Sequence, residues 1–538
     1  PRAFDECMYI LMCGTGVGFS VERDNVEKLP IVNEHFEKSN TVILVSDSRS
    51  GWARALRELI SLLYAGQIPT LNVSAIRPSG AKLKTMGGRA SGPAPLLDLY
   101  NFCVGIFKGA KGRKLYPIEC HDIMCKIGEV VVVGGVRRSA LISLSNLNDD
   151  QMRHAKSGKW WDTESQRSLA NNSVAYKNKP EIGTFMREWL SLYESHSGER
   201  GIFNRQAAIN KVEENRRRNS EHEFGCNPCS EIILRPYQFC NLTEVVCRVT
   251  DTLDTLRQKI EVATILGTFQ STLTNFKYLR KIWKQNTEEE RLLGVSLTGI
   301  LDCPILSPDN GALEGTLEEL REVAVQTNKK YAKILGIPQS TAITCVKPSG
   351  TVSQLVDSSS GIHARHSEYY IRTVRAGNTD PLTQFMKDVG IPAEPCVIKP
   401  DTTTVFSFPT KSPEGAVTRT EMNAIEQLEY WLVFQRHWCE HKPSVTISVK
   451  KDEWMEVGAW VYKNFDEVSG ISFLPFDEHV YQQAPYQDVE KEEYLELKSI
   501  MPKSIDWSKL AEYEKEDTTT GSKEFACTAD SCEIVDIQ

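Results

Sequence analysis

The sequence has 538 residues, enough for about three or four average domains or for one large enzyme core. Hydrophobic residues make up 41% and charged residues 25%, which allows a large buried core and excludes a largely disordered chain. The net charge of −8 argues against a protein that coats nucleic acid or an anionic membrane. There is no apolar run of about 18 residues and no basic start of a signal peptide, so we expect a cytoplasmic protein with mostly reduced cysteines.

Hydrophobic periodicity predicts helices and strands that alternate along the chain. Apolar residues spaced by three and four positions predict helices at residues 50–64, 251–266, 317–334 and 422–438. Ser46, Asp47 and Ser48 are the candidate caps of the first helix. Short β-branched runs predict strands at residues 41–45, 129–133, 140–143, 341–346, 404–408 and 444–449. This alternation indicates an α/β architecture.

The two ends of the sequence differ from its middle. It opens on Pro-Arg-Ala-Phe without an initiator methionine, so we expect a piece of a longer reading frame. From Glu512 onward the residues are polar and poor in large apolar groups, which predicts a mobile tail. Cys527 and Cys532 lie in this tail, and a flexible dithiol can attack a distant disulfide as a thiolate. An incidental pair of tail cysteines is the alternative.

Residues 225–244, GCNPCSEIILRPYQFCNLTE, carry the densest set of reactive groups. Pro228 disfavours helical geometry at Asn227, so the segment should be extended or looped. In an extended chain, alternate side chains point to the same side, which would place Asn227, Cys229 and Glu231 on one face. An amide, a thiol and a carboxylate offer a hydrogen-bonding group, a sulfur nucleophile or radical, and a general base.

Other interpretations of this segment remain open on local evidence. Cys226 and Cys229 form a Cys-x-x-Cys pair, and with Cys240 and Cys247 they could ligate zinc, although the spacing is irregular for a zinc ribbon. The pair could also serve a thiol oxidoreductase that uses no radical. A buried turn with incidental cysteines is the third alternative.

Two further segments have the composition of nucleotide-binding loops. No Walker A motif is present, but Ser349, Gly350, Thr351, Val352 and Ser353 follow a predicted strand and could offer backbone N–H groups and hydroxyls to phosphates. An ordinary strand-to-helix turn is the alternative. A second loop is basic and rich in glycine, which makes it adaptable, or else simply a solvated surface loop. Its candidate residues are Arg77, Ser79, Gly80, Gly87 and Gly88.

Several of these motifs together resemble a known family. Asn-Pro-Cys-Ser-Glu-Ile followed by Cys-Asn-Leu-Thr is similar to the active-site finger loop of ribonucleotide reductases. CGTGVGFSVER, RPSG with GGRASGP, GGVRRSALISLS and PSGTVSQLVDSSSGIH resemble the adenosylcobalamin-dependent (class II) ribonucleoside-triphosphate reductases, and in the same order. The resemblance covers essentially the whole chain.

The resemblance implies a role for each matching residue. Cys229 would carry a transient thiyl radical that removes the 3′-hydrogen of the substrate, Glu231 would take the 3′-hydroxyl proton, and Asn227 would bind the ribose hydroxyls. Cys240 would be one of the two cysteines that reduce the 2′-carbon. Its partner would lie before Pro1, and we interpret Cys7 and Cys13 as core residues of a following helix rather than as that partner.

The remaining implications concern the cofactor, the binding loops and the fold. The family implies adenosylcobalamin as the radical source, with no metal ligated by the protein itself. Cys527 and Cys532 would shuttle electrons from thioredoxin or a similar dithiol. The 349–353 loop would bind the substrate phosphates, and the glycine-rich region at about 74–93 would couple a deoxynucleoside triphosphate effector to substrate choice.

The expected fold is a ten-stranded α/β barrel of two antiparallel five-stranded parallel halves, with the finger loop at its centre. The expected domains are a catalytic barrel over residues 1–511 and a redox tail over 512–538. The expected reaction is the reduction of ribonucleoside triphosphates by a monomer.

Overall fold

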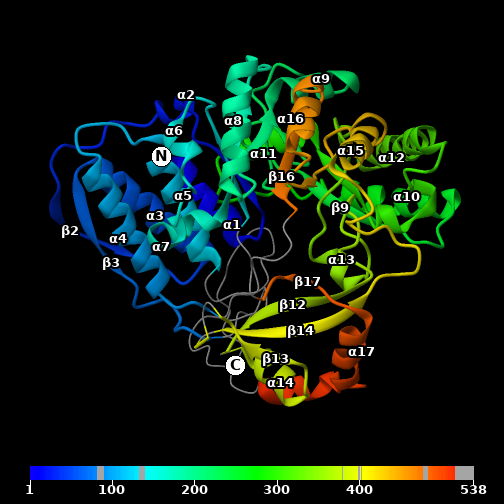
Figure 1. Ribbon diagram of the computed structural model, residues 1–538. Helices are drawn as coiled ribbons and strands as arrows, with labels where there is room; N and C mark the ends of the chain where they lie inside the picture. Colours follow the sequence, from blue (N-terminus) through cyan, green and yellow to red (C-terminus); the bar gives the residue numbers. More distant parts are fainter. Residues whose placement is uncertain are drawn as a thin grey trace.

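The structure is a computed structural model that describes residues 1–81, 90–132, 140–378, 380–397, 400–401, 403–476 and 483–514. Two sheets form its centre (Figure 1), with strand orders β1-β4-β5-β6-β16-β15 and β11-β10-β9. A parallel bridge between Val346 and Pro443 connects them, because Val346 follows β11 and Pro443 precedes β15. The strands are β1 (Val17–Ser20), β4 (Leu141–Ser145), β5 (Ala170–Tyr176), β6 (Gly201–Asn204), β9 (Asn241–Val246), β10 (Leu293–Thr298), β11 (Thr344–Cys345), β15 (Thr446–Val449) and β16 (Gly470–Pro475).

These strands run as two parallel sets in opposite directions. β1, β4, β5 and β6 pair in parallel, as do β9 with β10, β10 with β11, and β15 with β16. The sets meet where β16 pairs antiparallel with β6. The expected design of two opposed parallel halves is therefore present. The described strands supply nine of the ten expected, with β1 and β9 at the two edges of the array.

Helices cover both sets. Around the second set lies the largest apolar core, built from buried residues of the strands and of the flanking helices. These helices and their neighbours are α8 (Ile182–Ser195), α9 (Arg205–Glu214), α10 (Leu253–Gln270), α11 (Lys281–Glu290), α12 (Leu313–Leu335), α15 (Ala424–His437) and α16 (Trp454–Lys463). The helices predicted at 251–266, 317–334 and 422–438 are α10, α12 and α15, and each is confirmed within a few residues.

The N-terminal part forms its own apolar core beside β1. It contains α1 (Arg2–Met12), a parallel pair of β2 (Glu37–Leu44) with β3 (Gln67–Asn72), α3 (Arg49–Tyr64), α4 (Ala94–Gly109) and α5 (Pro117–Val132). The helix predicted at 50–64 is α3, and Ser48 is its cap, accepting a hydrogen bond from the Gly51 N–H.

The prediction of a strand at 129–133 is wrong for residues 129–132, the part of it that the structure describes. Residues 129–132 belong to α5, although they include a run of valines. Ile123, Ile127 and Val130 are buried at helical spacing in the same core as α1, and this packing overrides the β propensity of the run. The other five predicted strands correspond to β2, β4, β11, β14 (Thr403–Lys411) and β15.

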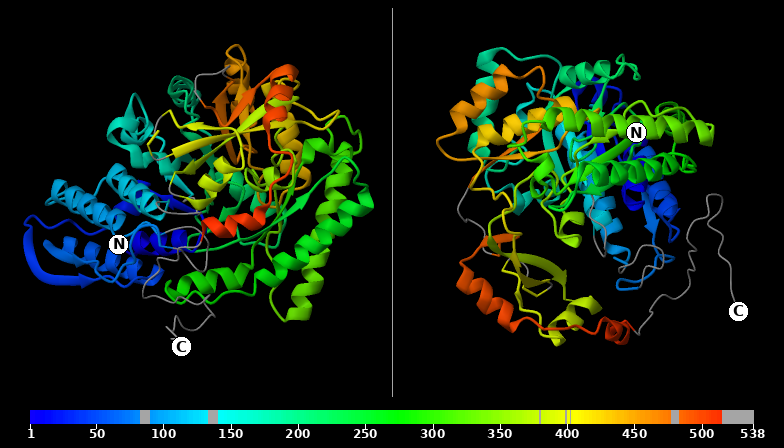
Figure 2. Two further views of the ribbon diagram at one scale, coloured as in Figure 1. Left: turned by 90° about the horizontal axis from the view of Figure 1, so that it is seen from below. Right: turned by 90° about the vertical axis from the view of Figure 1, so that its right-hand side faces the viewer.

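A small antiparallel sheet lies to one side of the central sheets, at the bottom of Figure 1 and of the right-hand view of Figure 2. Its order is β13-β14-β12-β17. It comprises β12 (Tyr369–Gly377), β13 (Ala393–Pro395), β14 (Thr403–Lys411) and β17 (Tyr486–Asp488), with α14 (Pro381–Asp388), α17 (Lys491–Ile500) and α18 (Leu510–Tyr513) beside it. The expected domain boundary at 511/512 falls within α18 and stays a prediction. None of the described helices is both long and apolar enough to cross a membrane.

Candidate active site

The site is built on a loop between two very short strands. β7 (Gly225–Cys226) and β8 (Ile233–Leu234) pair antiparallel, and we call residues 226–233 the finger loop. Its base packs in an apolar cluster with residues of β4, β5, β6 and α9. At its tip the Ser230 N–H donates to the Asn227 carbonyl (2.9 Å), which closes a tight turn. The predicted loop is therefore present, but as a turn rather than as an extended face.

The turn, rather than an extended chain, brings the three predicted side chains together. The Asn227 side chain hydrogen-bonds the Glu231 carboxylate, and its Oδ1 accepts from the Ile232 N–H at 2.9 Å. The charge of Glu231 in turn acts on the thiol of Cys229. Asn227, Cys229 and Glu231 thus share one small region.

Glycines in the surrounding strands make room for the finger loop. A Cβ at Gly18 of β1 would fall 1.8 Å from the Cys226 carbonyl oxygen, and one at Gly16 would fall 2.7 Å from Pro228. On the other side, a Cβ at Gly470 of β16 would lie 2.5 Å from Ser230 Oγ, and one at Gly294 of β10 would lie 3.0 Å from Ile232. Strands of both parallel sets therefore contact the loop closely, which places it between the two halves.

Burial raises the pKa of both reactive groups, which favours their neutral forms. The Cys229 side chain is exposed, yet enough protein surrounds it that desolvation, helped by the charge of Glu231, raises the pKa of its thiol to about 12. Glu231 is 1% exposed, and burial raises the pKa of its carboxyl group above the ordinary value. In the described part of the chain, Glu231 Oε2 has no hydrogen-bond partner. Such an oxygen is placed to accept a proton from a bound ligand.

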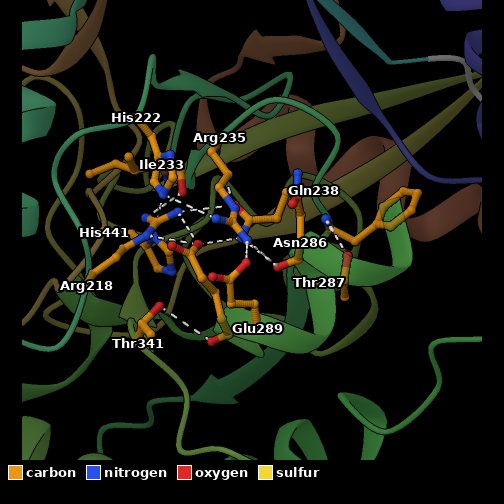
Figure 3. Close-up of polar contacts among 12 residues, drawn as sticks. Arg218, His222, Ile233, Arg235, Gln238, Asn286, Thr287, Glu289, Thr341 and His441 are labelled. Atoms are coloured by element: carbon orange, nitrogen blue, oxygen red, sulfur yellow. Dashed lines mark hydrogen bonds and ion pairs between the residues drawn. The ribbon is translucent and has the colours of Figure 1, made fainter. Parts of the chain in front are cut away.

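Cys240 directly precedes β9, and a buried polar network fixes the segment that leads to it. Arg218 donates to Glu290 Oε2 (2.9 Å), the Ile233 carbonyl (2.9 Å) and Gln238 Oε1 (3.1 Å). Arg235 donates to the Asn286 carbonyl at 3.2 Å, and also reaches Glu289. Figure 3 shows how these side chains connect the segment to α11. The chain is therefore held firmly from the finger loop to Cys240, whose thiol pKa is raised by burial.

The predicted phosphate loop directly follows β11. Ser349 has a positive φ of 50°, and the four-residue helix α13 (Val352–Leu355) begins after Thr351. Four buried hydroxyls here have no hydrogen-bond partner in the described structure, those of Ser349, Ser353, Ser358 and Ser359. A cluster of unpaired buried donors fits an anion with several oxygens. Ser358 and Ser359 were not singled out from the sequence, although the Ser-Ser-Ser-Gly run was a signal for them.

Lysines link this loop to the finger loop, and sequence reasoning missed them. Lys347 precedes the phosphate loop, and its charge acts on both Cys229 and Glu231. Its backbone N–H donates to Ser296 Oγ at 2.8 Å, which fixes the start of the loop on β10. Lys442 is fully buried next to Ser230. Nothing in the local sequence distinguishes these two lysines from surface lysines.

The described residues among those predicted for effector binding, Arg77, Ser79 and Gly80, lie in the N-terminal part. Arg77 donates to Asp47 Oδ2 at 2.7 Å, just before α3. Gly80, which follows Ser79, has a φ of +88°, and its N–H donates to the Ala90 carbonyl at 2.9 Å. Gly87 and Gly88 lie outside the described residues, as do Cys527 and Cys532 of the tail. The roles of these residues stay predictions.

The cysteines at the N-terminus and at the far end of β9 lie apart from the finger loop. Cys7 is buried in the core around α1, as expected, whereas Cys13 follows the end of α1 and is only half-buried, so its expected core position is wrong. Among the described residues, no three His, Cys, Asp or Glu side chains lie together as a metal site would need. Cys240 and Cys247 flank the six residues of β9, so about 20 Å of strand separates them. The zinc alternative is therefore not supported.

Comparison with known proteins identifies the relatives of the chain. Residues 19–104 match the family described as B12-dependent ribonucleotide reductase, insertion domain. Curated relatives called adenosylcobalamin-dependent ribonucleoside-triphosphate reductase come from Lactobacillus gasseri (28% identity, 90% of this chain and 73% of the relative) and Lactobacillus delbrueckii subsp. bulgaricus (29%, 91% and 74%). The Euglena gracilis enzyme of the same name is 28% identical over 90% of this chain and 66% of its own length.

A solved structure of a B12-dependent (class II) ribonucleotide reductase superposes with a TM-score of 0.76 at 24% identity, over 96% of this chain and 80% of that one. The expected barrel fold is confirmed by this likeness. The resemblance seen in the sequence motifs is confirmed over about nine-tenths of the chain.

Proposed function

We propose that this chain, which shares its sequence motifs and its fold with the adenosylcobalamin-dependent ribonucleotide reductases, reduces ribonucleoside triphosphates to 2′-deoxyribonucleoside triphosphates for DNA synthesis. The observation that carries the proposal is the finger loop. It places a neutral, exposed thiol at Cys229 beside a buried carboxyl group with an unpaired oxygen at Glu231.

The state of Cys229 suits a radical cofactor. Adenosylcobalamin, when bound, supplies a carbon radical that can take a hydrogen atom from a thiol. Such a transfer requires S–H rather than a thiolate, and the raised pKa of Cys229 keeps the hydrogen on sulfur at neutral pH. Among the described residues, Cys229 is the group that would meet this cofactor.

In the proposed reaction the residues act on the ribose in turn. The Cys229 thiyl takes the hydrogen atom from C3′, Glu231 takes the proton of the 3′-hydroxyl, and Asn227 holds the ribose hydroxyls. The 2′-hydroxyl then leaves as water with a proton from a thiol pair, Cys240 and a second cysteine. This pair also gives a hydrogen atom to C2′ and an electron to the 3′-ketone, and it ends as a disulfide. Glu231 returns its proton to the 3′-oxygen, and Cys229 returns its hydrogen atom to C3′. One C–O bond is thus replaced by C–H while two thiols are oxidised to a disulfide.

The phosphate loop supports a nucleotide substrate. The unpaired hydroxyls of Ser349 and Ser353 would donate to the phosphate oxygens, with Gly350, Thr351 and Val352 lending backbone N–H groups. We further propose that Cys527 and Cys532 pass electrons from thioredoxin or a similar dithiol, that a deoxynucleoside triphosphate effector acts through the region of Arg77, Ser79 and Gly80, and that the enzyme is a monomer.

Freeze-quench EPR tests the radical step. The chain is mixed anaerobically with adenosylcobalamin, a nucleoside triphosphate and a dithiol, and compared with its Cys229→Ser and Cys226→Ser variants. We expect a thiyl signal coupled to the metal of the cofactor, lost in Cys229→Ser and retained in Cys226→Ser. A signal that survives in Cys229→Ser contradicts the role of this thiol. Absence of any signal from the unchanged chain contradicts the cofactor.

A further inference from the structure

Residues 440–444 lie against the finger loop, and His441, Lys442 and Ser444 hydrogen-bond to it. Ser444 Oγ donates to the Cys229 carbonyl at 2.6 Å, and Lys442 Nζ donates to Ser230 Oγ at 2.8 Å. The Lys442 N–H donates to the Glu231 carbonyl at 3.0 Å. The next contact is from the Ile233 N–H to His441 Nδ1 at 3.3 Å. The backbone on both sides of Cys229 and Glu231 is therefore held by one short segment that is distant in sequence.

Lys442 is the unusual member of this segment. It is 0% exposed, and in the described part of the chain no carboxylate lies within ion-pair distance of it. Its ammonium instead donates to Ser230 Oγ and to the Ser469 carbonyl (3.4 Å), and it lies 4.6 Å from the centre of the Phe203 ring. Burying a cation in this way is unfavourable unless its surroundings compensate for lost water. A lysine in such a place points to a role in the site.

The backbone near Lys442 and Ser230 leaves space for their contact. Ser230 lies between Cys229 and Glu231 and has a φ of +65°, which is unfavourable for a residue with a side chain. A Cβ at Gly470 would fall 2.5 Å from Ser230 Oγ and 2.9 Å from Lys442 Nζ. Glycine in β16 therefore leaves the space that the pair fills.

We infer that Lys442 is a positioning residue of the active site. Its buried ammonium holds Ser230, and thereby fixes the placement of Cys229 relative to Glu231. The positive charge of Lys442 also favours the ionised form of Glu231. The catalytic importance of Lys442 in this inference rests on the proposed function. The contacts themselves, and the effect of the charge on Glu231, do not depend on it.

The electrostatic part follows from the groups that face each other here. Burial favours the protonated form of Glu231, whereas positive charge nearby favours the carboxylate that a general base needs. The titratable groups facing Glu231 are Cys226, Cys229, Cys240, Cys345, Lys347 and Lys442. Those facing Lys442 are Cys226, Glu231 and His441. Lys442 and Lys347 are thus the two cations that act on this carboxylate, and Lys442 is the fully buried one.

Infrared difference spectroscopy measures this effect without cofactor or turnover. Spectra of each protein with and without Glu231→Gln isolate the C=O band of the protonated Glu231 carboxyl group, which is then titrated with pH. In a Lys442→Met background we expect the band to persist to a pH about one unit higher, because one neighbouring positive charge is gone. Lys442→Arg keeps the charge and should titrate like the unchanged chain. Lys451→Met, at an exposed position, is the matched control.

Turnover separates positioning from general structural support. Lys442→Met should lower kcat at least tenfold and move the acidic limb of the pH–rate profile upward. Ser230→Ala removes the hydrogen bond but not the charge, so it should lower kcat without moving that limb. If Lys442→Met does not fold, Lys442→Gln provides the neutral variant, since it retains a donor for Ser230.

The outcomes distinguish the two proposals. An unshifted infrared titration in the neutral variants overturns the electrostatic role of Lys442, and unchanged kcat in those variants and in Ser230→Ala overturns its positioning role. If the unchanged chain shows no turnover with any reductant, the proposed function fails, whereas the infrared titration still decides the inference about Lys442.

Discussion

At the scale of single residues, the site combines two groups whose protonation is set mainly by burial. Desolvation is the largest cause of the raised pKa at both Cys229 and Glu231. A buried carboxyl group without a full set of partners destabilises the fold once it ionises. We therefore expect the buried carboxyl group of Glu231 to lower the stability of the protein while it makes the site reactive.

Glu231→Gln should separate stability from activity. Because the pKa of Glu231 is raised in the folded chain, the folded state holds a proton more tightly than the unfolded state, and stability falls as pH rises through the folded pKa. Glutamine removes this loss. We expect the variant to unfold at a higher temperature than the unchanged chain at pH 8, with a smaller difference at pH 4, and to have no turnover.

Thermal unfolding at the two pH values checks this, with Glu221→Gln at an exposed position as the control. A lower unfolding temperature of Glu231→Gln at pH 8 would contradict the argument.

At the scale of elements, the finger loop depends on strands that approach it without side chains. Gly18 of β1 is the extreme case, since its Cβ would meet backbone rather than a movable side chain. We expect Gly18→Ala to destabilise the protein by about 1–3 kcal/mol through overpacking and to abolish turnover by displacing Cys226 and its neighbours. Urea unfolding and activity assays check this.

Gly105→Ala is the matched control for Gly18→Ala. Gly105 is an exposed residue of α4 with nothing within 4 Å of the added Cβ. We expect this variant to be more stable by about 0.5–1 kcal/mol, because alanine favours a helix interior. Equal stability losses at both positions would show that close approach to the finger loop is not the cause.

In the phosphate loop, by contrast, we expect a substitution to weaken nucleotide binding without lowering the stability of the protein. Ser353 is buried, and its hydroxyl has no partner in the described structure, so Ser353→Ala removes a polar group that the folded chain leaves unpaired. We expect unchanged or slightly higher stability together with a KM for the nucleotide that is at least fivefold higher. Steady-state kinetics and urea unfolding check this, with Ser499→Ala as the control, because Ser499 is exposed and hydrogen-bonds within α17. An unchanged KM for Ser353→Ala would exclude this hydroxyl from phosphate binding.

The same elements show how far the sequence could be interpreted. The helices α3, α10, α12 and α15 follow from their own periodicity, and the finger loop was recognisable from Asn227, Cys229 and Glu231. The two-residue strands β7 and β8 could not be predicted, because their pairing and packing depend on β4, β5 and β6. The burial of Lys442 likewise results from contacts with Ser230 and Ser469, which no local pattern records.

At the scale of the whole molecule, the candidate active site and the proposed electron shuttle belong to different parts of the chain. The finger loop lies between the two parallel sets, whereas α18, beside the small sheet, is the last described helix before the tail. The proposed shuttle therefore connects regions that share no hydrogen-bonded sheet among the described strands. This separation makes the two functions independently testable.

We expect Cys527→Ser and Cys532→Ser to reduce turnover at least tenfold when thioredoxin is the reductant, and to leave turnover with a small dithiol within about twofold of the unchanged chain. The physical reason is that a small dithiol can reach the active-site disulfide directly. Parallel assays with the two reductants check this, with Ser531→Ala as the control. Equal losses with both reductants would mean that the two cysteines are not a shuttle.

The antiparallel join between β6 and β16 has a consequence for biosynthesis. Phe203 pairs with Gly470, so the two partners are 267 positions apart. At roughly 5–20 residues per second, a ribosome needs tens of seconds to proceed from the first strand to the second. Throughout that interval the open edge of β6 is available to other nascent chains, as unpaired strand edges are. Yield in the cell should therefore respond to translation speed and to chaperone supply more than the equilibrium stability of the finished enzyme would suggest.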